Sequence, residues 1–287
     1  MAQLSILIAN KIPRALETTE NVNPYGEKQT QIDVWSNRLL TSKLLRSGLV
    51  KQVASEEMDQ PVEAKRGQYS VVLDPLDGSS NIRTDNLMGT IVGVYSDSVI
   101  PAKGRHLLGA MYFLYGPYLA AVLGLQDGVY NLVAAGRGSA SKRFVSDGEP
   151  HRLPPHGGIY GIGGLRRKWI TIVREFAESL EHRGFKLRYG GSFVGDYNQI
   201  LMNGGFFAYP ELVDAPQGKL RLQFESNPLA FITEKAGGSA STGIGPILDV
   251  EPTGVDQRIP TYLGNADLVA ELEELMRNQT PHSSAPA

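Results

Sequence analysis

Apolar and polar positions alternate in two different ways along the first third of the chain. Over residues 32–45 apolar side chains recur every three or four positions, which predicts an amphipathic helix with Asp33 near its start. A polar stretch over residues 55–68 predicts a loop. The apolar, β-branched run over residues 69–73 predicts a buried strand, which we expect to stop at Asp74-Pro75 because proline cannot extend a strand ladder.

The region that follows has the pattern of a largely antiparallel sheet. Apolar runs predict strands at residues 89–95, 107–115, 118–125 and 129–134. Gly116-Pro117 and Asp127-Gly128 separate neighbouring runs and are typical turn pairs. Residues 136–155 are polar and rich in glycine and proline, so we expect a lobe boundary there. The N-terminal lobe, residues 1–150, would then carry most of the candidate metal ligands.

The second half of the chain alternates between helical and strand patterns. A helix is predicted from Trp169 to Leu180, because its apolar residues fall on one face. Strands are predicted at residues 206–209, 220–225 and 247–250, and helices at residues 228–236 and 268–276. We therefore expect an α+β fold of stacked layers in two lobes, with a C-terminal lobe over residues 151–278 and a flexible tail over residues 279–287.

Composition narrows the possible partners. The chain of 287 residues is 41% hydrophobic and 20% charged, with a formal net charge of −2. That charge gives no electrostatic case for nucleic acid or a membrane surface as partner. The chain has no cysteine, which excludes thiolate catalysis and thiolate metal sites. No apolar stretch approaches the roughly 18 residues of a membrane span, so we expect a soluble, cytoplasmic protein.

One acidic turn carries the strongest chemical signal. Asp74 and Asp77 lie three residues apart after the predicted buried strand, so both carboxylates could converge on one hard cation. Gly78, Ser79 and Ser80 add backbone N–H groups and hydroxyls of the kind that bind phosphate. Carboxylates would repel a phosphate unless a cation lay between them, and Mg²⁺ is suited to that position because it shares oxygen ligands with phosphates. A solvated turn is the alternative, since these residues are common in turns.

Other acidic residues are candidates for the same site only if the fold places them near this turn. Glu56 and Glu57 form an adjacent pair, which by itself indicates a solvated surface. Glu225 ends a predicted apolar strand, an unusual place for a carboxylate unless it faces a site or a cation. Asp33 is explained equally well as a helix-start residue.

Several longer segments resemble one enzyme family. They are QIDVWSN, ASEEM, KRGQYSVVLDPLDGSSNI, MGTIVGVY, RYGGSFVGDYNQILMNGGFFAYP, GKLRLQFESNPLAFITEKAGG and DVEPTGVDQRIP. Together they make the chain similar to the class I fructose-1,6-bisphosphatases from about residue 25 to residue 275. The DPxDG turn is shared with the wider lithium-sensitive phosphatase superfamily, whereas the later segments resemble the bisphosphatase branch. The resemblance implies the sugar phosphatase fold, a layered α-β-α-β-α sandwich.

The resemblance also implies a metal-dependent reaction. Two or more Mg²⁺ ions, with Mn²⁺ as a substitute, are expected on five carboxylates: Glu56, Glu57, Asp74, Asp77 and Glu225. The residues expected to activate water are Glu27, Asp33 and Glu57. Glu27 stands where the family more usually has aspartate, and its side chain is one methylene longer.

Substrate contacts are implied for both ends of a sugar bisphosphate. Those expected at the 1-phosphate are Gly78, Ser79, Ser80 and Arg221, and those at the sugar are Gly191 and Phe193. Those expected at the far phosphate are Tyr189, Tyr209 and Lys219. Arg188 is expected to reach the far phosphate of a neighbouring subunit, which implies a homodimer or homotetramer.

Two departures from the family pattern affect these expectations. Where the family has YSxNEGY, this chain reads YGIGGLR, so Gly163 replaces an asparagine at the far phosphate and Arg166 replaces a tyrosine. Arg166 resembles the sedoheptulose-1,7-bisphosphatase branch and could supply the lost contact, or it could be part of a solvated basic helix start. The segment before Asp33 is shorter than in the AMP-inhibited relatives, so we expect no AMP inhibition of that type.

The resulting hypothesis is Mg²⁺-dependent hydrolysis of the 1-phosphate of fructose 1,6-bisphosphate, a gluconeogenic step. Sedoheptulose-1,7-bisphosphatase activity, alone or in addition, is the alternative within enzymes. An inositol monophosphatase would leave Tyr189, Tyr209 and Lys219 without a purpose. A catalytically silent sugar-phosphate sensor is a further alternative, which the five intact metal positions argue against.

Overall fold

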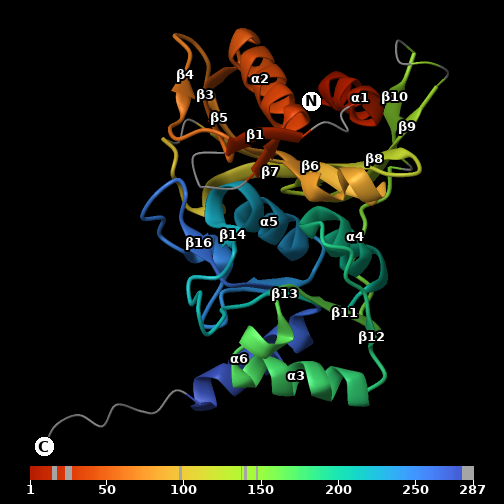
Figure 1. Cartoon of the computed structure of the whole chain (residues 1–287), viewed down its shortest axis with the longest axis vertical. Coiled ribbons are helices and arrows are strands. Elements are labelled where there is room, and N and C mark those ends of the chain that lie inside the picture. Colours follow the sequence, from red (N-terminus) through yellow and green to blue (C-terminus); the bar gives the residue numbers. More distant parts are fainter. Residues whose placement is uncertain are drawn as a thin grey trace, which may run out of the picture.

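Five stacked layers of helices and sheets make up the structure (Figure 1). The computed structural model describes residues 1–14, 18–22, 28–96, 99–136, 138, 141–146 and 148–279. Along the long axis the layers are helices, a large sheet, helices, a smaller sheet and helices again. This confirms the predicted α+β fold with an α-β-α-β-α order.

The larger sheet has eight strands in the order β10-β9-β8-β7-β6-β5-β3-β4. They are β3 (Val50–Ser55), β4 (Val62–Glu63), β5 (Tyr69–Asp77), β6 (Met88–Ser96), β7 (Leu107–Tyr115), β8 (Leu119–Leu125), β9 (Gly128–Ala135) and β10 (Arg143–Val145). Neighbours pair antiparallel except β3 and β5, which run parallel and pair Ser55 with Leu73 at their carboxyl ends. This register places Glu56, the residue after β3, beside Asp74 of β5.

Helices cover both faces of the larger sheet. On the outer face lie α1 (Ala2–Lys11) and α2 (Gln31–Arg46), and on the inner face lie α4 (Phe193–Asn203) and α5 (Asn227–Lys235) (Figure 1). The short antiparallel strands β1 (Thr18–Val22) and β2 (Lys28–Thr30) lead into α2. None of the described helices is both long enough and apolar enough to cross a membrane.

The smaller sheet has five strands in the order β12-β11-β13-β17-β15. They are β11 (Ile159–Ile162), β12 (Lys186–Leu187), β13 (Phe206–Tyr209), β15 (Ser239–Ser241) and β17 (Thr261–Gly264). The inner helices α4 and α5 pack on one face, and α3 (Thr171–His182) and α6 (Ala266–Gln279) lie on the other. A separate antiparallel pair, β14 (Leu220–Arg221) and β16 (Arg258–Ile259), lies near the carboxyl end of β5.

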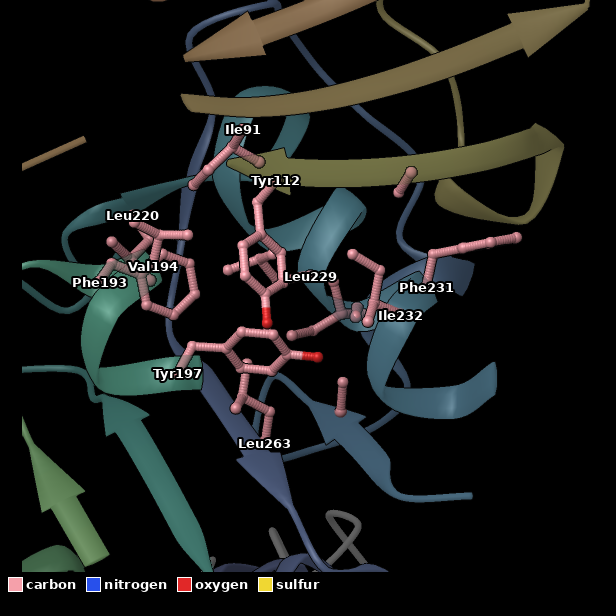
Figure 2. Packing of buried hydrophobic residues seen from close by; sticks show 14 of the residues in the cluster. Ile91, Tyr112, Phe193, Val194, Tyr197, Leu220, Leu229, Phe231, Ile232 and Leu263 are labelled. Atoms are coloured by element: carbon pink, nitrogen blue, oxygen red, sulfur yellow. The ribbon is translucent and has the colours of Figure 1, made fainter. Parts of the chain in front are cut away.

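Aromatic packing fixes α4 between the two sheets. The rings of Tyr112 on β7 and Tyr197 on α4 meet edge to face, with centroids 5.7 Å apart (Figure 2). Both rings are buried, and each hydroxyl has a partner: Tyr112 donates to Asn198 Oδ1 at 2.8 Å, and Tyr197 lies 3.0 Å from the Thr233 hydroxyl. These contacts hold the helix whose first turn reaches the candidate site.

Most predicted elements are confirmed, and three boundaries were wrong. The strand expected to end at Asp74-Pro75 continues to Asp77, because the ladder with β6 skips residues 75–76 and resumes at Asp77 and Gly89. The strand expected over residues 220–225 is only β14, followed by a π-helical turn, Leu222–Ser226. Residues 247–250 do not form a strand, since Ile247–Asp249 is a 3₁₀ helix.

The remaining predictions concern the start of α3, the lobe boundary and the tail. The helix predicted from Trp169 begins two residues later, while Trp169 packs in the same buried cluster. Among the described elements, the sequence pattern did not predict the helices α1 and α4 or the strands β1, β2, β3, β4, β10, β11, β12, β15, β16 and β17. The division into lobes at residue 150 remains a prediction. The predicted tail over residues 279–287 lies outside the described residues except for Gln279, the last residue of α6.

Candidate functional site

A cavity of about 340 Å³ opens where the carboxyl end of β5 meets the first turn of α4 and the β14 segment. Most of the residues predicted to act line it. The full set is Asp33, Glu56, Glu57, Asp74, Leu76, Asp77, Gly78, Ser79, Ser80, Gly191, Phe193, Tyr209, Lys219, Leu220, Arg221 and Glu225. Residues up to 192 positions apart in the sequence, Asp33 and Glu225, therefore line one cavity.

Three carboxylates form the centre of the cavity. Glu56, Asp74 and Glu225 each offer one oxygen, and these oxygens lie within 4.8 Å of one another. Burial raises the pKa of Asp74 well above its usual value, and the negative charges of Glu56, Asp77 and Glu225 raise it further. The pKa of Glu225 is also raised well above its usual value, first by burial and then by Glu56. An oxygen-only set whose members repel one another fits a hard divalent cation such as Mg²⁺.

The backbone after β14 turns Glu225 into this cluster. The Glu225 carboxylate accepts a 2.6 Å hydrogen bond from the backbone N–H of Arg221, across the π-helical turn. The Arg221 guanidinium, only 2% exposed, is ion-paired with Glu56. Arg221 therefore supplies positive charge at the edge of the cluster and orients two of its carboxylates.

The interrupted end of β5 orients two aspartates differently. Asp74 Oδ1 accepts from the Leu76 N–H at 2.9 Å, which fixes the carboxylate inside the turn. Asp77 Oδ2 instead accepts from Ser192 Oγ at 2.8 Å and from the Val194 N–H at 2.7 Å, both in the other half of the chain. Burial raises the pKa of Asp77, while these hydrogen bonds oppose the shift. Asp77 thus binds the first turn of α4 and also lines the cavity.

The turn after Asp77 is tight and lies against the start of α4. Gly78 has a φ of 78°, and a Cβ there would lie 2.7 Å from the Ser192 Cβ, so only glycine fits this approach. Ser79 begins a 3₁₀ helix, Ser79–Thr84, and both Ser79 and Ser80 line the cavity. Both serines therefore line the same cavity as the carboxylates.

Asp33 satisfies both interpretations left open by the sequence. It forms a capping box with Thr30, whose backbone N–H and hydroxyl donate to Asp33 Oδ2 at 2.7 and 2.8 Å. It also lines the cavity and hydrogen-bonds Ser79, and burial raises its pKa. The start of α2 thus places a carboxylate of raised pKa beside Ser79, in the turn after Asp77.

An aromatic wall bounds the cavity opposite these acids. Tyr209 at the end of β13 is 4% exposed, its ring meets Phe193 edge to face, and the Lys219 ammonium lies 5.1 Å from the ring centroid. Tyr189, which is 45% exposed, shares a 3.0 Å hydroxyl hydrogen bond with Tyr209. These groups offer neutral donors and one positive charge.

Three described residues predicted for the site, Tyr189, Arg166 and Arg188, are not among those lining the cavity. Arg166 is ion-paired with Glu178 and Glu181 of α3. Arg188 is exposed just after β12 and takes no part in the cavity wall. Glu27 lies outside the described residues.

The sequence analysis missed the residues that join the two halves of the site. Asp196, in the first turn of α4, accepts from the N–H groups of Gly190 and Gly191 at 2.6 and 3.0 Å. The amides of Asn81 and Asn86 donate to the Gly190 carbonyl at 3.2 and 3.0 Å. The available signal was Ser192, an N-cap residue followed by Asp196 in the first turn, which is typical of a helix start.

Comparison with known proteins gives a consistent assignment. The family model of the fructose-1,6-bisphosphatase N-terminal domain matches residues 6–138, and that of the C-terminal domain matches residues 153–277. A class 1 fructose-1,6-bisphosphatase of Pelobacter propionicus is 45% identical over 266 residues, covering 91% of this chain and 81% of that protein. One from Halobacterium salinarum is 39% identical over 271 residues, covering 94% and 92%.

Solved structures share the architecture. The holo form of fructose-1,6-bisphosphatase from Leishmania major superposes with a TM-score of 0.89 at 32% identity, covering 97% of this chain and 92% of that one. A candidate sedoheptulose-1,7-bisphosphatase from Toxoplasma gondii superposes with a TM-score of 0.87 at 27% identity, with the same coverage. From the two matching family models and the identity to class 1 relatives, the chain belongs to the class 1 fructose-1,6-bisphosphatase family.

Proposed function

We propose that the protein hydrolyses the 1-phosphate of fructose 1,6-bisphosphate to give fructose 6-phosphate and phosphate. The observation that carries the proposal is the single cavity that combines the carboxylate cluster of Glu56, Asp74 and Glu225 with the turn at Ser79 and the aromatic wall at Tyr209. A cation bound by the carboxylate cluster and a phosphate-binding turn would suffice to hydrolyse a sugar monophosphate. Tyr209 and Lys219 add a second polar subsite, which favours a bisphosphate.

The metal proposal names Mg²⁺, with Mn²⁺ as a substitute. The ligands would be Glu56, Glu57, Asp74, Asp77 and Glu225. When bound, the cation supplies Lewis-acid stabilisation of the phosphoryl charge and lowers the pKa of a coordinated water. Asp77 would bind the cation through the oxygen that Ser192 and Val194 do not bind.

The protein's own groups have distinct roles in this proposal. The N–H groups and hydroxyls of Gly78, Ser79 and Ser80 would bind the 1-phosphate, with Arg221 adding charge. Asp33 lies against Ser79 and has a raised pKa, so it is suited to accept the proton of the attacking water, as is Glu57. Glu27 would assist from the preceding segment.

The sugar and the far phosphate would occupy the opposite wall. Gly191 and Phe193 would contact the sugar. Tyr189, Tyr209 and Lys219 would bind the far phosphate, because two hydroxyls and an ammonium converge there. Arg166 stays a prediction for this subsite, and its ion pairs with Glu178 and Glu181 weigh against it. We further propose that Arg188 reaches a neighbouring subunit of a homo-oligomer and that the reaction serves gluconeogenesis in the cytoplasm.

A seven-carbon substrate is the second candidate. It is favoured by the structural likeness to the candidate sedoheptulose-1,7-bisphosphatase of Toxoplasma gondii. Side-by-side kcat/KM values for fructose 1,6-bisphosphate and sedoheptulose 1,7-bisphosphate would decide between them, and we expect the six-carbon sugar to be preferred.

Phosphate release with and without Mg²⁺ tests the proposed function. Glu225→Gln keeps the size of the side chain but removes a charged ligand, so we expect a loss of about a hundredfold or more in kcat/KM. Glu274→Gln, on the exposed face of α6, is the matched control and should behave like the wild type. Equal activity of the Glu225→Gln variant would contradict the metal assignment.

A further inference from the structure

Ser192 lies where the carboxylates of the cavity meet the wall proposed to bind the sugar. It is the N-cap residue of α4 and is only 2% exposed. It is not itself among the residues that line the cavity, but its chain neighbours Gly191 and Phe193 both are. The contacts of its side chain therefore determine how these two sides of the cavity are connected.

The hydroxyl of Ser192 is occupied in both of its roles, as acceptor and as donor. Its oxygen accepts a 3.3 Å hydrogen bond from the N–H of Gly195, in the first turn of α4. Its proton is donated to Asp77 Oδ2 at 2.8 Å. A hydroxyl has only one proton to donate, so the bond to Asp77 uses it fully. Removing the hydroxyl would take away one of the hydrogen bonds that orient Asp77 against α4.

The same side chain packs on the turn proposed to bind the 1-phosphate. A Cβ at Gly78 would lie 2.7 Å from the Cβ and 2.8 Å from the Oγ of Ser192, closer than real side chains approach. The turn and the serine are therefore in direct contact, and a shift of one displaces the other.

The sugar wall is joined to Ser192 through the backbone. On one side the N–H of Gly191 donates to Asp196 at 3.0 Å. On the other side the buried ring of Phe193 stacks on Phe207, with centroids 5.6 Å apart. Because the residues before and after Ser192 are both held, its hydroxyl keeps its place beside Asp77 only while Gly191 and Phe193 keep theirs.

We propose that Ser192 is a positioning residue that couples cation binding to sugar binding. Its hydroxyl holds Asp77 in place for the cation when Gly191 and Phe193 are in place for the sugar, so each ligand raises the affinity for the other. This inference rests on the proposed function. It assigns the coupling to one hydrogen bond of a residue that touches neither ligand.

Binding of Mn²⁺ and fructose 6-phosphate to the intact protein tests the coupling without turnover. Fructose 6-phosphate lacks the 1-phosphate that would join the sugar to the cation directly, so a mutual effect has to pass through the protein. The Kd for Mn²⁺ is measured from the EPR signal of unbound Mn²⁺, with and without saturating fructose 6-phosphate. In the wild type we expect the sugar phosphate to lower this Kd by about fivefold or more.

Ser192→Ala should remove the coupling. We expect the Kd for Mn²⁺ alone to rise by about tenfold, because Asp77 loses a hydrogen bond that orients it. Added fructose 6-phosphate should then change this Kd by less than about twofold. Ser192→Gly should give the same result and is the second variant, because glycine is accepted at an N-cap and the start of α4 is kept if Ser192→Ala does not fold.

Ser241→Ala is the matched control. Ser241 on β15 is 1% exposed, and its hydroxyl also donates to a carboxylate, that of Glu273, and accepts from a backbone N–H, that of Gly243, at 2.9 Å. Ser241 is not among the residues that line the cavity. This variant should keep the wild-type Kd for Mn²⁺ and the wild-type response to fructose 6-phosphate.

Three results would overturn the inference. They are a response of wild-type size in a folded Ser192→Ala or Ser192→Gly variant, an equal loss of the response in Ser241→Ala, and a wild type whose Kd for Mn²⁺ does not change with fructose 6-phosphate. A wild type that binds no Mn²⁺, or no fructose 6-phosphate, would instead refute the proposed function, so the two failures are distinguishable.

Discussion

The Asp77 carboxylate accepts a 2.7 Å hydrogen bond from the backbone N–H of Val194, 117 positions later in the chain. The contact joins the end of β5 to the first turn of α4, where backbone N–H groups have no partners within the helix. An anionic side chain at that end also interacts favourably with the helix dipole. The Asp77 carboxylate thus connects the larger sheet to α4 and also lines the cavity.

Replacing Asp77 by asparagine should separate these roles. The asparagine oxygen can still accept from Val194, but its NH₂ group would face the cavity, where it cannot bind a cation. We expect kcat/KM with Mg²⁺ to fall by about a hundredfold or more. The free energy of unfolding, measured in urea, should fall by only about 1–2 kcal/mol. Asp127→Asn, in the exposed turn before β9, is the control for both measurements. A nearly normal rate in the Asp77→Asn variant would contradict its place in the metal site.

The carboxylate cluster should make the metal-free protein less stable as the pH rises. The pKa of Asp74 is raised in the folded state, so the folded state holds its proton more tightly than the unfolded chain, whose aspartates titrate near about 4. The contribution of Asp74 to stability is therefore greatest at low pH and is lost as the pH rises above about 4 toward the raised pKa. Mg²⁺ should reverse this trend, because it binds the ionised form.

Melting temperatures from pH 5 to pH 8, with chelator or with Mg²⁺, check this prediction. Asp74→Asn keeps an oxygen for the Leu76 N–H, so it should raise the melting temperature of the metal-free protein at high pH by several degrees and weaken the response to Mg²⁺. A metal-free melting temperature that does not change with pH in the wild type, together with no response to Mg²⁺, would count against a cation site.

Asp196 should act on substrate binding without touching the substrate. Its two oxygens accept from Gly190 and Gly191, and Gly191 lines the cavity. Asparagine can accept only one of these hydrogen bonds and would turn its NH₂ group toward the other N–H. We expect Asp196→Asn to raise KM by about tenfold with a smaller change in kcat.

The same contact predicts a pH effect on KM. Burial raises the pKa of Asp196 to about 6, so the wild-type carboxylate takes up a proton below that pH and loses one acceptor. KM should therefore rise as the pH falls below about 6, and this part of the rise should be missing in Asp196→Asn. Parallel KM profiles for the two proteins would show that Asp196 does not position the turn.

Much of the fold follows from local patterns, and the exceptions have physical causes. Strands β6 to β9 of the larger sheet were predictable because apolar runs alternate with turn pairs. The end of β5 was not, because Pro75 suggests a stop, whereas the strand resumes at Asp77 through its pairing with Gly89. The π-helical turn that orients Glu225 has no distinct sequence pattern, since its residues also fit a buried strand.

The candidate site, like the fold, was predictable where its residues stand in local motifs and unpredictable where distant segments meet. The acids near the DPLDG turn could be assigned because they stand in recognisable segments. The links to Ser192, Val194 and Asp196 could not, because they join positions more than 100 residues apart or bind backbone atoms that carry no sequence signal. The contact between Gly78 and Ser192 is likewise visible only in space.

The most direct test of the central claim is ³¹P NMR of fructose 1,6-bisphosphate incubated with the protein and Mg²⁺. The account predicts that the 1-phosphate resonance is replaced by inorganic phosphate while the 6-phosphate resonance persists, and that chelation of Mg²⁺ stops the change. Persistence of both phosphate resonances, loss of the 6-phosphate first, or an equal rate in the presence of chelator would contradict it.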